Sequence, residues 1–351
     1  MYKFSYRSDD EISKNLSMIA AIILQEKFDI VAMQEVMNKG VMSLLQMQLG
    51  FQNWEFAWEQ PPARGRDVVD GMGGEGYAFL WNNNRIRPVE TGYTTGIREF
   101  IPRIFSQYSV DDSFRKRNIK LERDPYYGRF TPQGLPGGGF FEFRIINTHI
   151  RYSKYKDKDI GSVPIRKNEF QILAECIYPK ICDRRYGNNM PAYTILLGDY
   201  NLNLLDSGAG SPYVSPLVFY TDAGRTRRIT TVQTGLSTLK QKQEGTLNEL
   251  MNGTEEANAA SKNNGIEGTD VTLAGSIIKK ELEKWKVYSN NYDHFTYDED
   301  KFDGIGLTIE RVDAVRKYYK GDVEAYRREV SDHVPVVIDI DLKSRRGNTY
   351  E

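Results

Sequence analysis

The sequence predicts an α/β fold, because short apolar segments typical of buried strands alternate with segments of helical periodicity. The clearest apolar segments are residues 28–36, 140–150 and 193–198, and the clearest helical ones are residues 10–27 and 165–182. The strands end in acidic or amide residues, and neither a GxGxxG nor a GxxxxGK[ST] motif occurs. The dinucleotide-binding and P-loop classes are therefore excluded.

In the first half of the chain, apolar residues recur at helical spacing in residues 10–27, which predicts an amphipathic helix. Residues 28–36 follow as a buried strand. A loop rich in glycine, proline and arginine at residues 61–76 leads into a second buried strand at residues 77–81. Residues 111–139 combine mixed charge with several glycines and prolines, so we expect a surface excursion there.

The second half continues the alternation of strands and helices. Residues 240–270 are polar and have no strong period, which indicates an insertion with a mobile part. Residues 293–298 and 333–342 are expected to be strands, with a charged helical segment between them.

The composition is that of an ordinary globular protein. The chain has 351 residues, a formal net charge of -1, 40% hydrophobic and 27% charged residues, which excludes disordered, collagen-like and membrane-embedded classes. It has 2 Cys and 3 His, so a disulfide framework and a cysteine-rich zinc site are also excluded. The balanced charge disfavours a protein that coats DNA non-specifically, although it is compatible with a local basic groove.

Features of targeting and membrane segments are missing from the sequence. No apolar run approaches the roughly 20 residues that a membrane-spanning helix needs. The N-terminal segment lacks the apolar core of a secretory signal. We therefore expect a cytoplasmic location and no stable association with a membrane.

Polar and ionisable side chains gather at the ends of the predicted strands, where the backbone is rigid enough to hold a site. They are Gln34 and Glu35, Asn147 and His149, Asp199 and Asn201, Asp293 and His294, and Asp332 and His333. A carboxylate that bonds one imidazole nitrogen fixes the tautomer and leaves the other nitrogen for acid–base work. Oxygen ligands suit a hard cation, so the set indicates Mg²⁺ or Mn²⁺, with Ca²⁺ as the alternative. The residues that offer such ligands are Glu35, Asp199, Asn201 and Asp332.

Five short motifs occur in order at these strand ends: DIVAMQE, NTHIR, GDYN, YDHF and SDHVPV. In this order they resemble the endonuclease/exonuclease/phosphatase superfamily, whose familiar members include deoxyribonuclease I and exonuclease III. The resemblance extends roughly from Asp29 to Leu342. It implies a four-layer α/β/β/α sandwich of two packed mixed β-sheets, and metal-assisted hydrolysis of phosphodiesters or phosphomonoesters.

Because the motifs run from the first strand to the last, we expect a single domain at residues 1–342. We also expect insertions at about residues 101–139 and 205–286, and a frayed tail at residues 343–351. The family normally begins with a strand that carries a metal- or phosphate-binding Asn, and no such strand precedes the first helix. Asn15 lies inside that expected helix and is no substitute.

For metal binding, the resemblance implies that Glu35 is the metal-binding acid, assisted by Asp332 or Asp199. Asp199 and Asn201 match the Asp-x-Asn pair that orients water, metal and the scissile phosphate. Asn201 is therefore an expected substrate contact.

For catalysis, the resemblance implies that His149 is the catalytic His of the central strand. His333 matches the terminal His, as general base or transition-state stabiliser, and Asp293 matches the acid that orients it. Glu75 stands where deoxyribonuclease I-like members have a Glu that pairs with the central His. The resemblance therefore lies on the deoxyribonuclease I side of the superfamily.

Two neighbours of His149 are candidates for phosphate contact. Arg151 lies two residues after His149, on the same face of the strand, and could reach a phosphate. Asn147 is the second candidate.

The leading functional hypothesis is a deoxyribonuclease I-like nuclease that cleaves nucleic acid by in-line attack of water. The alternative is a phosphatase or phospholipase that acts on a small or lipid phosphoester. The polar character of the long insertions favours a soluble or nucleic-acid substrate. A third hypothesis, motivated by the missing Asn strand, is a superfamily member that binds its ligand without cleaving it.

Overall fold

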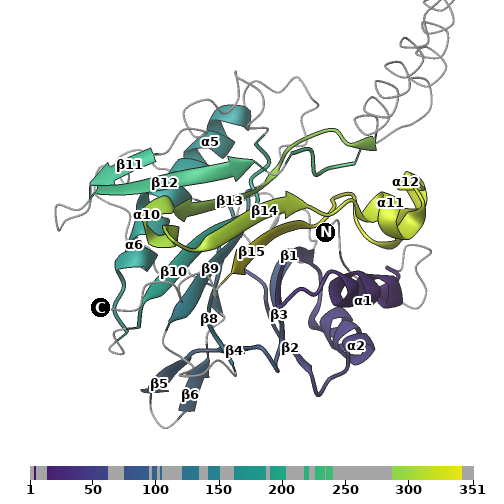
Figure 1. Ribbon diagram of the computed structural model, residues 1–351, viewed down its shortest axis with the longest axis horizontal. Coiled ribbons are helices and arrows are strands. Elements are labelled where there is room, and N and C mark those ends of the chain that lie inside the picture. Colours follow the sequence, from purple (N-terminus) through teal and green to yellow (C-terminus); the bar gives the residue numbers. More distant parts are fainter. Residues whose placement is uncertain are drawn as a thin grey trace, which may run out of the picture.

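A computed structural model gives the arrangement of helices and strands (Figure 1). It describes residue 4 and residues 14–61, 75–94, 97–100, 103–104, 121–133, 141–150, 162–186, 190–202, 217–220, 226–233, 235–239 and 287–341.

The largest sheet in the described part of the chain has eight strands. Seven follow one another in the order β11-β12-β13-β10-β9-β8-β4, and β7 pairs with β8. β9 and β10 are parallel and the other neighbours are antiparallel, so this sheet is mixed. The strands are β4 (Ile86–Pro88), β7 (Arg103–Ile104), β8 (Tyr126–Pro132), β9 (Glu142–His149), β10 (Ala192–Asp199), β11 (Leu217–Tyr220), β12 (Thr226–Gln233) and β13 (Asp293–Asp298).

Smaller antiparallel sheets complete the β-structure. One has the order β1-β3-β2, one pairs β14 with β15, and one pairs β5 with β6. Phe4 adds a parallel bridge to Val36 at the end of β1. The strands are β1 (Ile30–Val36), β2 (Trp54–Glu59), β3 (Gly76–Asn82), β5 (Glu90–Thr94), β6 (Ile97–Phe100), β14 (Gly306–Arg311) and β15 (Val336–Asp341).

The helices are short, and several begin at a polar residue whose side-chain oxygen accepts a hydrogen bond from a free backbone N–H of the first turn. Asn15, Asn38 and Asp322 act in this way on α1, α2 and α12. The helices are α1 (Leu16–Gln25), α2 (Lys39–Leu49), α5 (Ser162–Ile172), which continues through the π-helical turn η1 (Leu173–Ile177) into α6 (Tyr178–Asp183), α10 (Glu299–Phe302), α11 (Ala314–Tyr319) and α12 (Val323–Glu329).

The alternation of side chains along the strands divides the core of the described residues into three clusters. In β3, Phe79 and Trp81 point to one face and Ala78 and Leu80 to the other. The first face packs against β8, β9, β10 and β13, and also against β14 and β15. The second face packs against α1, α2, α11 and α12.

The opposite face of the eight-stranded sheet has its own helical cover. There Ile146 of β9 and Leu196 of β10 pack against Phe170 of α5 and Ile177 of η1. Figure 1 shows α1 and α2 on one side of the strands and α5 and α6 on the other. The predicted α/β fold with two packed sheets is confirmed, although only the larger sheet is mixed among the described strands.

Two boundaries from the sequence need correction. The expected helix at residues 10–27 begins at Leu16, because Asn15 accepts a hydrogen bond from Met18 N at 3.1 Å and so acts as its N-cap. Within the expected surface excursion at residues 111–139, residues 126–132 form β8, and all seven are buried. The charged residues there suggested a surface position, but Arg129 is fully buried and forms an ion pair with Glu142, which is buried as well.

The other segments give a mixed outcome. The strands expected at residues 28–36, 77–81, 140–150, 193–198, 293–298 and 333–342 are confirmed as β1, β3, β9, β10, β13 and β15. The region expected as an insertion at residues 205–286 contributes β11 and β12, which extend the large sheet beside β13. Residues 343–351 lie outside the described residues. No helix among the residues described is long and apolar enough to cross a membrane.

Candidate active site

The register of the large sheet brings three of the predicted residues together at one edge. His149 ends β9 and lies opposite Asp199, which ends the parallel strand β10. On its other side Asp199 lies opposite Asp293, the first residue of β13. Glu35 of β1 and the loop before β15 face this edge, and together they form a pocket. The pocket is lined by Gln34, Glu35, His149, Asp199, Asp293, Asp332 and His333.

His333 is held by a carboxylate that is itself hydrogen bonded. Its Nδ1 lies 2.7 Å from Oδ2 of Asp293, and Ser237 Oγ donates to the same oxygen at 2.5 Å. Burial lowers the pKa of His333, but the carboxylates of Asp293, Asp199 and Asp332 together outweigh burial and raise that pKa to about 10. Burial raises the pKa of Asp293, but the charge of His333 and the hydrogen bonds from His333 and Ser237 together bring it below its ordinary value. His333 is therefore an imidazolium at neutral pH.

Asp199 lies between the two imidazoles. Its Oδ2 is 3.7 Å from His149 Nε2 and 3.8 Å from His333 Nε2. Its Oδ1 accepts the backbone N–H of Asn201 at 2.8 Å. Burial, opposed by the charge of His333 and assisted by that of Asp293, raises the pKa of Asp199 to about 6. A carboxylate with this pKa can accept a proton near neutral pH.

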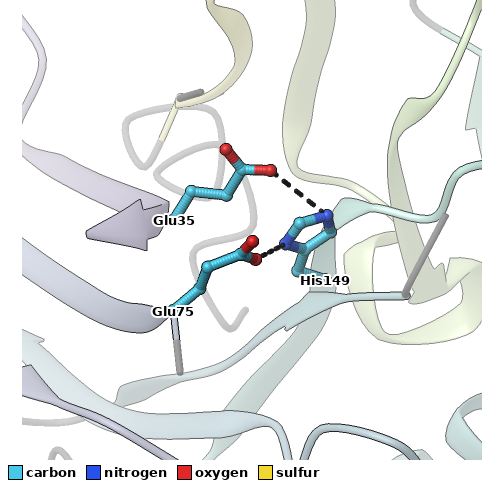
Figure 2. A group of neighbouring side chains, drawn as sticks. All are labelled: Glu35, Glu75 and His149. Atoms are coloured by element: carbon cyan, nitrogen blue, oxygen red, sulfur yellow. Dashed lines mark ion pairs between the residues drawn. The ribbon is translucent and has the colours of Figure 1, made fainter. Parts of the chain in front are cut away.

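His149 has acidic side chains on both sides of its ring, as Figure 2 shows. Glu35 Oε1 lies 3.7 Å from Nε2, and Glu75 Oε2 lies 3.4 Å from Nδ1. Glu75 therefore lies beside His149, as the sequence predicted. Arg123 contacts both residues: its Nη1 lies 3.0 Å from His149 Nδ1, and its Nη2 lies 2.8 Å from Glu75 Oε2.

Two residues at the site have a left-handed backbone, which is uncommon outside glycine. Glu35 has φ +58° and lies in a bulge of β1, and Asn201 has φ +49°. Arg166 on α5 donates to the carbonyl oxygen of Asn201 and holds this turn in place. Such strain concentrates where a side chain must be aimed at a particular point.

The two predicted amide contacts, Asn147 and Asn201, are buried and are not among the residues that line the pocket. Asn147 is fully buried, donates to Met33 O at 3.0 Å and accepts from Gln34 at 2.6 Å. Asn201 donates to Ile150 O at 2.7 Å. For Asn147 this corrects the expected phosphate contact, because its amide links the two sheets instead.

Other sequence expectations have simpler outcomes. Arg151 lies outside the described residues. His294 is buried away from the pocket, with Nε2 3.0 Å from Leu202 O. Asn15 caps α1 and donates to Glu329, so it does not line the pocket.

The donor set fits a divalent cation. Oδ1 of Asp332 is buried without a hydrogen-bond partner among the described residues, and a buried carboxylate oxygen requires a donor or a cation. Glu35, Glu75 and His149 also bring ligand atoms within 4.8 Å of one another. Arg123 already bonds Nδ1 of His149 and Oε2 of Glu75. We therefore expect the carboxylates of Glu35 and Asp332 to be the ligands of a cation.

The sequence did not reveal Arg123 or Ser237. Each lies in a short irregular segment without periodicity, and each contacts the site only through the tertiary fold. No local signal distinguishes Arg123 from the many other arginines of the chain.

Comparisons with known proteins identify similar solved structures, whereas no family model and no curated protein matches. An endonuclease/exonuclease/phosphatase family protein from Leptotrichia buccalis is 13% identical, with 97% of each chain covered and a TM-score of 0.45. The human Nocturnin catalytic domain with bound sulfate is 13% identical, with 97% of this chain and 92% of that chain covered and a TM-score of 0.46. D. rerio TDP2 complexed with a single-strand DNA product is 11% identical, with 95% and 94% covered and a TM-score of 0.47. The superfamily that the sequence motifs resemble is the one named in the description of the Leptotrichia protein.

Proposed function

We propose that the chain is a metal-dependent hydrolase of phosphoester bonds, and that its substrate is nucleic acid. The observation that supports this most strongly is the position of Asp199 between the imidazoles of His149 and His333. Both imidazoles and the acids Glu35 and Asp332 line the same pocket. A proton acceptor, two nitrogen donors and a cation site are thus within reach of one phosphate.

In the proposed reaction, Asp199 accepts a proton from the attacking water. His333 is cationic at neutral pH, so it stabilises negative charge on the phosphoryl oxygens instead of acting as the base. His149 approaches from the opposite side of Asp199 and donates to the leaving oxygen or a phosphoryl oxygen. A Mg²⁺ or Mn²⁺ ion held by Glu35 and Asp332 would neutralise a non-bridging phosphate oxygen.

The choice of nucleic acid as substrate is supported by the deoxyribonuclease I side of the sequence resemblance. Glu75, which marks that side, lies next to His149 at the site. The basic side chains of Arg227 and Arg228 on β12 are engaged in ion pairs, with Asp183 and Asp300 respectively. A basic path for the phosphate backbone would therefore have to come from other segments.

A plasmid-nicking assay beside a phosphate-release assay tests the proposal. We expect conversion of supercoiled plasmid to the nicked form in Mg²⁺ or Mn²⁺, and its loss in EDTA. Phosphate release from small or lipid phosphoesters without nicking would replace the nuclease by the phosphatase or phospholipase alternative. Metal binding without turnover of any substrate would contradict the enzyme and favour the binding module.

A further inference from the structure

Arg123 is a buried arginine that bonds two residues of the site at once. Its side chain is 8% exposed and lies in the short segment that enters β8. Nη1 points at Nδ1 of His149 at 3.0 Å, and Nη2 forms an ion pair with Glu75 Oε2 at 2.8 Å. The guanidinium therefore contacts both the imidazole and the carboxylate that was expected to orient it, and these two groups lie 3.4 Å apart.

The chemistry of the guanidinium decides which atom of His149 holds the proton. A guanidinium has only N–H donors and stays charged in proteins. A nitrogen that receives its hydrogen bond must offer a lone pair, so Nδ1 of His149 is the acceptor. In the neutral ring the proton is then on Nε2. Glu75 alone would impose the opposite arrangement, because a carboxylate can only accept a hydrogen bond and Glu75 lies 3.4 Å from Nδ1.

The two histidines of the site consequently have opposite hydrogen-bond polarity at Nδ1. His333 Nδ1 faces the acceptor Asp293 at 2.7 Å and must be a donor. His149 Nδ1 faces the donor Arg123 and must be an acceptor. A carboxylate orients one ring and a guanidinium orients the other.

We infer that Arg123 is a positioning residue that holds His149 as the Nε2–H tautomer, so that His149 presents a hydrogen-bond donor to the substrate. Nε2 is the nitrogen on the pocket side, since it lies 3.7 Å from both Glu35 Oε1 and Asp199 Oδ2. The inference deepens the proposed function and rests on it for the identity of the substrate. The tautomer itself is a property of the free protein.

Nuclear magnetic resonance of histidine labelled with nitrogen-15 measures the tautomer directly. The chain has 3 His, and a spectrum of the His149→Gln variant assigns the ring signals of His149 by their disappearance. In the metal-free wild type, we expect an unprotonated Nδ1 and a protonated Nε2. In Arg123→Ala, the proton should move to Nδ1, from which the ring can donate a hydrogen bond to Glu75. In Glu75→Gln, Arg123 is retained and the ring should keep the wild-type tautomer.

Kinetics add a readout that a merely structural role would not change. We expect kcat of Arg123→Ala to fall by about 10²- to 10⁴-fold, the range that proton donation supplies, with little change in KM. Arg123→Lys restores a donor to Nδ1 and should recover part of kcat together with the wild-type tautomer. Arg87→Ala, which removes an exposed arginine from the edge strand β4, is the matched control and should retain wild-type activity.

The outcomes separate this inference from the proposed function. A wild-type His149 with its proton on Nδ1 would overturn the inference, and so would an Arg123→Ala variant that keeps the wild-type tautomer. If the ring shows the expected tautomers but no phosphoester is hydrolysed under any condition, the inference on Arg123 stands and the proposed function fails.

Discussion

Nδ1 of His333 donates a hydrogen bond to Oδ2 of Asp293 over 2.7 Å. The carboxylate comes from the start of β13 and the imidazole from the loop before β15, so the contact joins two segments 40 residues apart in sequence. It stabilises a positive charge on His333, in a pocket lined by four carboxylates. The charge state of this ring should therefore be visible in the stability of the protein as well as in its activity.

Replacing Asp293 by Asn should change the pH dependence of folding. The pKa of His333 is raised to about 10, above its ordinary value of about 6.5. Its contribution to stability is therefore fully present below about pH 6.5 and is lost as the pH rises towards 10. In urea unfolding of the metal-free protein, the free energy of unfolding should fall between pH 7 and 10 in the wild type more than in Asp293→Asn. If the free energy of unfolding fell equally with pH in both proteins, the pairing of His333 with Asp293 would be contradicted.

Divalent metal should stabilise the fold through Glu35 and Asp332. A ligand that binds only the native state at 100 times its Kd adds about 2.7 kcal/mol to the free energy of unfolding. Mg²⁺ or Mn²⁺ should therefore raise Tm of the wild type, and the increase should be much smaller in Glu35→Gln and Asp332→Asn. Asp322→Asn, an equal change of charge at the exposed cap of α12, is the control and should keep the full increase. An increase of the same size in all four proteins would place the metal elsewhere.

Among the glycines that the structure describes, Gly198 should be the one at which an added methyl group is most damaging. It has φ +136°, and a Cβ there would lie 1.9 Å from the carbonyl oxygen of Thr148. We expect Gly198→Ala to lower the free energy of unfolding by about 3 kcal/mol or more, and to disturb the adjacent His149 and Asp199. Gly304 has φ +71° and open space around it, so Gly304→Ala should lower the free energy of unfolding by only about 1 kcal/mol. Denaturant unfolding measures the free energy of unfolding of both variants. Equal decreases would show that the close contact with Thr148 does not determine the cost at Gly198.

The strand-end residues could be predicted from sequence because their positions follow from simple geometry. Apolar segments identify β9 and β10, and parallel strands that end together bring His149 beside Asp199. Asp293 lies beside Asp199 through the antiparallel pairing of β10 and β13. The order of motifs supplied Glu35, Asp332 and His333, which line the pocket with them. Glu75, Asn147 and Asn201 are not among the lining residues, and Arg151 lies outside the described residues.

What could not be predicted depends on contacts between segments far apart in sequence. The charge of Arg129 suggested exposure, but a buried partner on the neighbouring strand neutralises it. Arg123 lies 26 residues before His149 and 48 after Glu75, and only the folded chain brings the three together. Asn147 resembled a ligand at a strand end, yet its alternation along β9 directs it to the backbone of Met33.

The most direct measurement is the rate of phosphodiester hydrolysis in Mg²⁺ by the wild type, His149→Ala and His333→Ala. Both substitutions remove a donor to the phosphate at the edge of the sheet, without cutting into the three apolar clusters. We expect each variant to keep a wild-type circular dichroism spectrum and a cooperative unfolding transition, while the rate falls by about 10²-fold or more. A wild-type rate in either variant, or a rate that EDTA leaves unchanged, would contradict a metal-dependent hydrolase built around Asp199 and the two histidines.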